Sequence, residues 1–269
     1  MRRPGAEAAA PRHRTVGWLL AAFCVLVAAV VITAVLPASL AARFLPPSVS
    51  AQDFSGSLWH GSAAHIRVGG RDAGALEWQL QPAALLHLGL DARLHWVQRA
   101  FVLDGRLTAA GQSLKLSQLE GGGPLEDLQD LGLPAGCRGL AQVNLPELEA
   151  SLAAGAPSLK SMTGTVRVDD LVLPAVGGAA PLGSYVLDLP APDAAAGPEL
   201  TGHVHDSGGP LGLDAQVRYA PQTHLGTLSG TVVPRGPLPA GLRRGLDDLA
   251  ALHAPDPQGR IPLDLEFTL

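Results

Sequence analysis

The chain has 269 residues, of which 47% are hydrophobic and 16% charged, and its formal net charge is −5. This composition is typical of a packed domain and excludes an intrinsically disordered chain. The acidic balance excludes a nucleic-acid-binding surface, which needs clustered basic residues.

An uncharged stretch of 21 residues, 16–36, lies near the N-terminus. As a helix it is roughly 31 Å long, which matches a bilayer hydrocarbon core of about 30 Å. Four arginines precede it (Arg2, Arg3, Arg12 and Arg14), so the positive-inside rule predicts a cytoplasmic N-terminus and an exported remainder. We therefore predict a cytoplasmic tail over 1–15, a transmembrane helix over 16–36, an extended linker over 37–52 and one exported domain over 53–269.

The alternative for this stretch is a cleaved signal peptide. Residues 39–41 (Ser-Leu-Ala) offer small residues at a cleavage site. However, the apolar core of such peptides usually has about 7–15 residues, so the sequence favours a retained anchor.

After residue 52 the dominant hydrophobic period is two, the pattern of strands with one apolar and one polar face. The alternation is most regular over 86–96, which predicts one long strand. Weaker alternation predicts strands near 76–80, 101–103, 114–116, 166–168, 185–189, 211–219 and 261–269. Because parallel strands buried on both faces would read as continuous apolar runs, we predict a mainly β fold built on a curved antiparallel sheet.

Two segments are expected to form short helices that cover this sheet. Residues 124–131 and 238–253 both place leucines at helical spacing on one side.

The sequence of 88–96 (Leu-Gly-Leu-Asp-Ala-Arg-Leu-His-Trp) also resembles that of 211–219 (Leu-Gly-Leu-Asp-Ala-Gln-Val-Arg-Tyr). This echo suggests two similar halves, 53–125 and 160–269; the alternative is a chance likeness in a leucine-rich chain.

No cofactor or metal site is predicted. Cys24 lies in the uncharged stretch and Cys137 far outside it, so neither a disulfide nor a cysteine-based metal site is expected. His203 and His205 share one face of a predicted strand, with Asp206 beside them. A catalytic zinc site needs three protein ligands, and no further ligand spacing stands out, so we favour a pair of solvated polar residues.

A protease signature is present in fragments. Residues 206–211 (Asp-Ser-Gly-Gly-Pro-Leu) resemble the nucleophile segment of trypsin-like serine proteases, and a triad of His65, Asp104 and Ser207 has the correct chain order. However, His205 stands where that family has a glycine, which weakens the oxyanion hole. Asp, Ser and Gly are also common turn residues, so a turn before a strand is the simpler interpretation.

Several motifs in order resemble the type II secretion system protein N family, also called general secretion pathway protein N. They are residues 54–63 (Phe-Ser-Gly-Ser-Leu-Trp-His-Gly-Ser-Ala), 76–82 (Leu-Glu-Trp-Gln-Leu-Gln-Pro), 182–185 (Leu-Gly-Ser-Tyr), 208–211 (Gly-Gly-Pro-Leu), 233–236 (Val-Pro-Arg-Gly) and 259–263 (Gly-Arg-Ile-Pro-Leu). None is specific by itself, whereas the ordered set covers almost the whole chain.

The resemblance implies a single-pass inner-membrane protein of a Gram-negative bacterium. Its periplasmic domain would be a non-enzymatic accessory part of the machine that exports folded proteins through an outer-membrane secretin. The partners it implies are other inner-membrane subunits and the secretin itself. A looser likeness, to the half-open sheets of AsmA-like envelope proteins, leaves a lipid-handling groove as an alternative function.

Trp59 and Trp78 are the candidate contact residues in this interpretation. In a chain so poor in aromatic residues, a tryptophan is more often an anchor of the core than a partner contact. Both readings stay open from the sequence.

Overall fold

The structure is a computed structural model that describes residues 36–44, 49–87, 89–151, 158–174, 180–191, 199–223, 225–236, 238, 240–252 and 254–268. Except for Leu36, the predicted transmembrane helix lies outside these residues. Within the described ranges, no helix is both long enough and apolar enough to cross a membrane.

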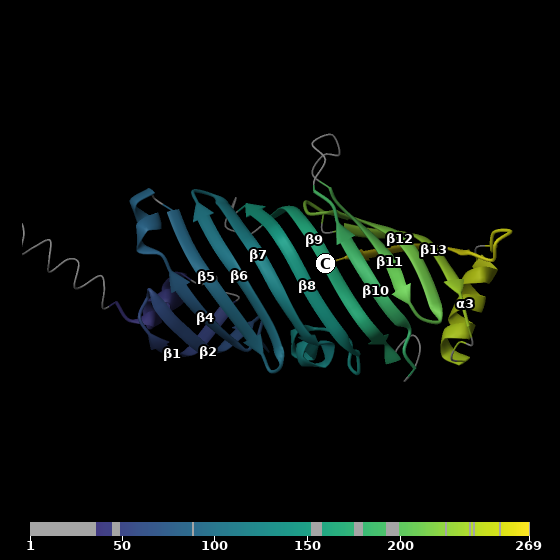
Figure 1. Cartoon of the computed structure of the whole chain (residues 1–269), viewed down its shortest axis with the longest axis horizontal. Helices are drawn as coiled ribbons and strands as arrows, with labels where there is room; N and C mark the ends of the chain where they lie inside the picture. The colour runs from purple at the N-terminus through teal and green to yellow at the C-terminus, as the bar shows by residue number, and fades with distance from the viewer. Residues whose placement is uncertain are drawn as a thin grey trace, which may run out of the picture.

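One 14-stranded antiparallel sheet dominates the fold, so the predicted mainly β architecture is confirmed. Thirteen strands pair with their neighbours in chain order, and only the short β3 lies off this path, beside β2. Figure 1 shows these strands following one another from one end of the molecule to the other. The strands are β1 (Val49–Gly56), β2 (His60–Val68), β3 (Arg71–Asp72), β4 (Ala75–Leu80), β5 (Gly89–Gln98), β6 (Phe101–Ala110), β7 (Ser113–Pro124), β8 (Arg138–Ser151), β9 (Ser158–Val172), β10 (Gly183–Leu189), β11 (Leu200–Gly208), β12 (Leu211–Ala220), β13 (Leu225–Pro234) and β14 (Ile261–Thr268).

The strand registers align one apolar residue or glycine from each of the thirteen strands. We call this set the apolar row. Because side chains alternate between faces along a strand, the row marks one face of the sheet as apolar from end to end. Its members are Phe54, Ala63, Leu76, Trp96, Leu103, Gly121, Val143, Val166, Leu187, Val204, Ala215, Gly230 and Leu263.

Two helical segments cover parts of the apolar face, as the leucine spacing predicted. The 3-10 helix η3 (Leu125–Leu131) packs Leu125 into a buried cluster with Phe101, Cys137 and Ala141. At the far end of the molecule, α3 (Ala240–Leu252) buries Leu242 and Leu246 against β13 and β14 (Figure 1). Burial also raises the pKa of the Cys137 thiol, since desolvation disfavours the thiolate.

The start of the predicted strand over 86–96 is wrong. Residues up to His87 belong to the 3-10 helix η2 (Pro82–His87), and β5 begins at Gly89. Pro82 has no N–H for a sheet ladder, and the N–H of Ala84 instead closes a turn onto Gln81 O at 3.2 Å. Alternation alone does not reveal this because leucines in a short helix can mimic a strand period.

Two other segments also differ from the simplest expectation. The region predicted as an extended linker contains the 3-10 helix η1 (Ala38–Phe44) and the first residues of β1. Between the suggested halves lies β8, which pairs with β7 on one side and β9 on the other, so the sheet continues from one half to the other. The suggestion of two similar halves stays a prediction.

The segment 182–185 packs the start of β10 against the hairpin formed by β11 and β12. Gly183 has φ +127°, and a Cβ there would lie 2.6 Å from the carbonyl oxygen of Gly208, so this close approach requires glycine. The hydroxyl of Tyr185 donates to the carbonyl oxygens of Leu182 and Leu211, at 3.0 and 3.3 Å. Burial raises the pKa of this phenol to about 12, with a smaller contribution from Asp206.

We predict that Tyr185→Phe lowers the free energy of unfolding of the purified chain by about 1–2 kcal/mol, because two carbonyl groups lose their donor. In the parent chain the neutral phenol is favoured in the folded state. The stability that the neutral Tyr185 phenol gives the fold is therefore present below its pKa in the unfolded state, about 10. This stability is lost as the pH rises toward 12. Urea unfolding as a function of pH measures both effects.

Tyr219→Phe, at the second of the two tyrosines, is the matched control. The ultraviolet titration of that variant must retain the late tyrosinate transition of Tyr185. A Tyr185→Phe protein as stable as its parent at neutral pH contradicts this account, and so does a Tyr219→Phe protein without a late transition.

Candidate functional site

The polar face carries a second aligned set, which we call the polar row. Each of the thirteen strands contributes one polar residue, which is the sequence neighbour of that strand's member of the apolar row. Five members are carboxylates and two are imidazoles, whereas none is Lys or Arg. The members are Ser55, Ser62, Glu77, His95, Asp104, Glu120, Asn144, Thr165, Asp188, His203, Gln216, Ser229 and Asp264.

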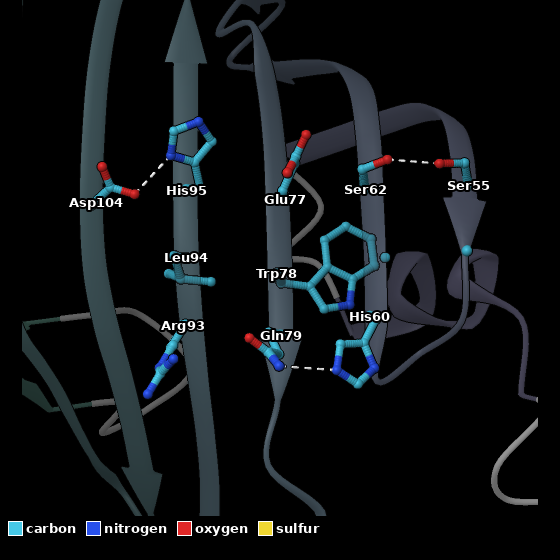
Figure 2. Close-up of a pocket in the computed structure, with 12 residues that line it drawn as sticks. Ser55, His60, Ser62, Glu77, Trp78, Gln79, Arg93, Leu94, His95 and Asp104 are labelled. Carbon is cyan, nitrogen blue, oxygen red and sulfur yellow. Dashed lines mark hydrogen bonds and ion pairs between the residues drawn. The ribbon is translucent and has the colours of Figure 1, made fainter.

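The N-terminal end of the polar row lines an open pocket of about 500 Å³ over β1, β2, β4, β5 and β6. Its side chains pair with one another across neighbouring strands (Figure 2). The hydroxyls of Ser55 and Ser62 are 2.7 Å apart, and Nδ1 of His95 lies 2.7 Å from Oδ1 of Asp104. The pocket thus combines polar pairs across neighbouring strands with the charged side chains of Glu77 and Arg93.

This pocket does not assemble a nucleophile with a base. Glu77 stands between Ser62 and His95 in the sheet, so the serine and the histidine are two strand spacings apart, about 9–10 Å. A nucleophile and its base need hydrogen-bond contact, and here the serine hydroxyl is occupied by Ser55 instead.

The protease-like triad is also not assembled. His65 lies on β2, Asp104 on β6 and Ser207 on β11. Five strand spacings separate β6 from β11, which is about 24 Å. In place of the triad contacts, Asp104 meets His95, and His65 lies 3.9 Å from Asp53.

His203 and His205 share a face of β11 as predicted, with stacked rings whose centroids are 5.5 Å apart. However, each faces its own carboxylate. His203 Nε2 is 2.7 Å from Asp214 and His205 Nδ1 is 3.5 Å from Asp188. Asp206 lies apart from both rings, where it accepts from the Leu213 N–H and pairs with Arg235. Over the part of the chain that the structure describes, no three such side chains are grouped to hold a metal ion.

On the opposite face, the sheet is hollowed by a groove with a volume of about 490 Å³, which we call the apolar groove. It extends over the same five strands as the polar pocket, and Trp78 and Leu94 contribute to the lining of both. Its lining consists almost wholly of hydrocarbon and aromatic side chains. They include Phe54, Trp59, Leu76, Trp78, Leu80 and Leu94.

Both tryptophans singled out in the sequence therefore lie in the wall of this groove. Each is half-buried, and neither belongs to the two buried clusters beneath η3 and α3. The indole N–H of Trp78 donates to Leu58 O at 2.9 Å, and its ring meets Phe54 edge-on at 6.3 Å. The carbonyl oxygen of Trp59 accepts from the Leu80 N–H at 2.7 Å.

A glycine fixes the position of the Trp78 ring. A Cβ on Gly61 would lie only 2.6 Å from a ring carbon of Trp78 and 2.6 Å from the carbonyl oxygen of Ser57. The spacing of Trp59, Gly61 and Trp78 in the family-like motifs is thus a packing requirement of the groove wall.

The sequence pattern did not identify the groove as a site. Alternation at 76–80 and 90–96 predicted an apolar face, but not which part of that face the helices leave uncovered. Phe54, Leu80 and Leu94 carried no signal of their own, because leucine and phenylalanine on an apolar face are ordinary core residues.

Comparisons with known proteins extend over nearly the whole chain. The family model described as type II secretion system, protein N, matches residues 47–264. A type II secretion system protein N from Vibrio cholerae serotype O1 is 27% identical over 269 aligned positions, which cover 95% of this chain and 99% of that protein. No solved structure matches the chain.

Proposed function

Since the chain belongs to the type II secretion system protein N family, we propose that it is an accessory inner-membrane component of the type II secretion machinery. In this role it acts by protein–protein contact in the export of folded proteins from the periplasm across the outer membrane. The observation that carries the proposal is the family match over residues 47–264, together with a relative aligned along almost its full length.

The proposed topology has residues 1–15 in the cytoplasm, residues 16–36 across the membrane and residues 53–269 in the periplasm as one domain. The uncharged stretch with arginines on one side supports this orientation. The chain enters the domain beside β1, where the carbonyl oxygen of Leu36 accepts from the Leu58 N–H at 2.7 Å. The anchor would therefore hold the β1 end of the sheet next to the membrane.

The free edge of β14 is the surface that we propose for a partner subunit. A terminal strand offers unpaired backbone groups to an added strand. The sheet path ends at β1 and β14, and β1 already has η1 and Pro37 beside it. On β14 the polar face carries Asp264 and Glu266, so an added strand with basic side chains opposite them is favoured, whereas pairing with a second acidic β14 is not.

We predict that deletion of the gene strongly reduces the amount of several exoproteins in the medium and leaves them in the periplasm. The machine would lack one contact between its parts, while the folding of its cargo is unaffected. Immunoblots of medium and periplasm measure the distribution, and a plasmid copy of the chain must restore it.

The Ser207→Ala variant is the matched control for hydrolytic activity. Its residue lies on β11, five strands along the sheet from Asp104 on β6, so this variant must restore export like the parent chain. A deletion strain with normal export would overturn the proposed role, and failure of Ser207→Ala alone would point to the protease alternative.

For the anchor, we predict that the polypeptide purified from membranes has the mass of the full chain. An alkaline phosphatase domain fused after Leu269 should be active, because that enzyme folds only after export. A soluble product that lacks the first 41 residues would instead identify residues 39–41 as a cleavage site and remove the anchor from the proposal.

For the edge, we predict that a photoreactive amino acid in place of Glu266 crosslinks to another secretion subunit in intact cells. The same amino acid in place of Gln142, which is exposed on the central strand β8, should give no such adduct. Mass spectrometry of the adducts identifies the partner. Adducts of the chain with itself, or equal adducts from both positions, would refute the proposed edge.

A further inference from the structure

The sheet ends at β14 with one side of its backbone unpaired. In the described part of the chain, β14 pairs with β13 on one side and packs against α3, and no strand adjoins its other side. Three successive residues there, Asp264, Leu265 and Glu266, are exposed. Leu265 is 48% exposed, whereas Leu263 on the same face is buried in the cluster beneath α3. The helix therefore covers the beginning of β14 and leaves its second half open.

The hydrogen bonds of β13 fix which backbone groups of β14 point outward. The N–H of Arg235 donates to Pro210 O at 2.8 Å, so every second residue from Arg235 backward along β13 faces β12. The residues between them face β14, where Leu228 pairs with Leu265. Because successive residues direct their backbone groups to opposite sides of a strand, the groups of the two residues beside Leu265 point to the free edge.

The outward groups therefore belong to Pro262, Asp264 and Glu266. Pro262 has no N–H to offer, and such an outward position on an edge strand is where a sheet tolerates proline. Asp264 and Glu266 each present both a donor and an acceptor. The stretch that can pair with an added strand thus begins after Pro262 and runs to the end of β14 at Thr268.

An antiparallel strand on this edge would continue the arrangement of the whole sheet, and its side chains would meet two different environments. Opposite Asp264 and Glu266 it exchanges backbone hydrogen bonds, and its side chains lie beside two carboxylates, where a basic residue is stabilising and an acidic one is not. Opposite Leu265 the pair is not hydrogen-bonded, so the Cα atoms are about 4.5 Å apart instead of about 5.5 Å. A hydrophobic side chain at that close position covers Leu265.

We infer that β14 binds an antiparallel strand of another protein in which basic and hydrophobic residues alternate. The basic residues lie opposite Asp264 and Glu266, and the hydrophobic ones lie opposite Leu265 and Phe267. That this other protein is a secretion subunit rests on the proposed function, whereas the pattern, direction and register of its strand follow from β14 itself.

The test uses the full chain in detergent micelles and a synthetic peptide as the probe, acetyl-Thr-Val-Lys-photoleucine-Lys-Val-Thr-amide. Placed antiparallel, its lysines lie opposite Glu266 and Asp264, and the photoreactive residue lies opposite Leu265. Irradiation should give an adduct within β14, which mass spectrometry locates, and the yield at increasing peptide concentration gives the apparent affinity. Glutamate in place of both lysines, or serine in place of both valines, should weaken binding about tenfold.

Methylation of the peptide backbone tests the register. Methyl groups on the nitrogens of both lysines should abolish the adduct, because these N–H groups donate to β14. Methyl groups on the nitrogens of both valines should leave the adduct in place, since those nitrogens point away from the edge. The reverse result would identify a parallel strand and overturn the inferred pairing.

Charge reversal on the chain is the complementary test. Glu266→Lys should weaken binding of the lysine peptide about threefold and strengthen binding of the glutamate peptide. The matched control is Glu77→Lys, which reverses an exposed carboxylate of the polar row on the interior strand β4 and should change neither affinity.

A chain without an adduct in β14, or equal binding of the lysine and glutamate peptides, would overturn the inference. Equal effects of Glu266→Lys and Glu77→Lys would do the same. The peptide assay needs no other part of the secretion machinery, so its failure leaves the proposed role in export untouched. Conversely, a deletion strain with normal export would remove the secretion subunit as the partner and would leave the strand-binding edge in place.

Discussion

The structure depends on the register of thirteen antiparallel strands. Each pairing places an apolar residue or glycine opposite another, from Phe54 at one end to Leu263 at the other. A slip of one residue in any pair would move the apolar side chains of a strand to the polar face. The alternation along each strand and the alignment between strands are therefore one constraint, and together they give the sheet one apolar and one polar side.

A one-sided sheet about 58 Å across, estimated from twelve strand spacings, needs cover for its apolar face. Two short helical segments supply part of it, and Leu125, Leu242 and Leu246 are the side chains through which they do so. The remainder is the apolar groove. This hydrophobic surface lies at the β1 end of the sheet, next to the proposed anchor.

The motifs that carry the family resemblance meet one another in space. The segment 54–63 contacts 76–82 through Trp78, whose indole bonds to Leu58 and whose ring requires Gly61. The segment 208–211 receives the Tyr185 hydroxyl on Leu211, and the carbonyl oxygen of Pro210 accepts from the Arg235 N–H at 2.8 Å. These residues are positioned for packing, which explains why they form an ordered set in the sequence.

The sequence by itself determined the mainly β class, the antiparallel pairing and the position of α3, because periods of two and of 3.6 residues are local properties of the chain. It also determined the family. The tertiary structure decided which residues become neighbours: Asp104 meets His95 while Ser207 lies far away, and Trp59 and Trp78 line one groove. It decided too that residues 86 and 87, predicted to begin a strand, belong to η2. These outcomes depend on registers and on helix placement between segments distant in sequence, which no local pattern encodes.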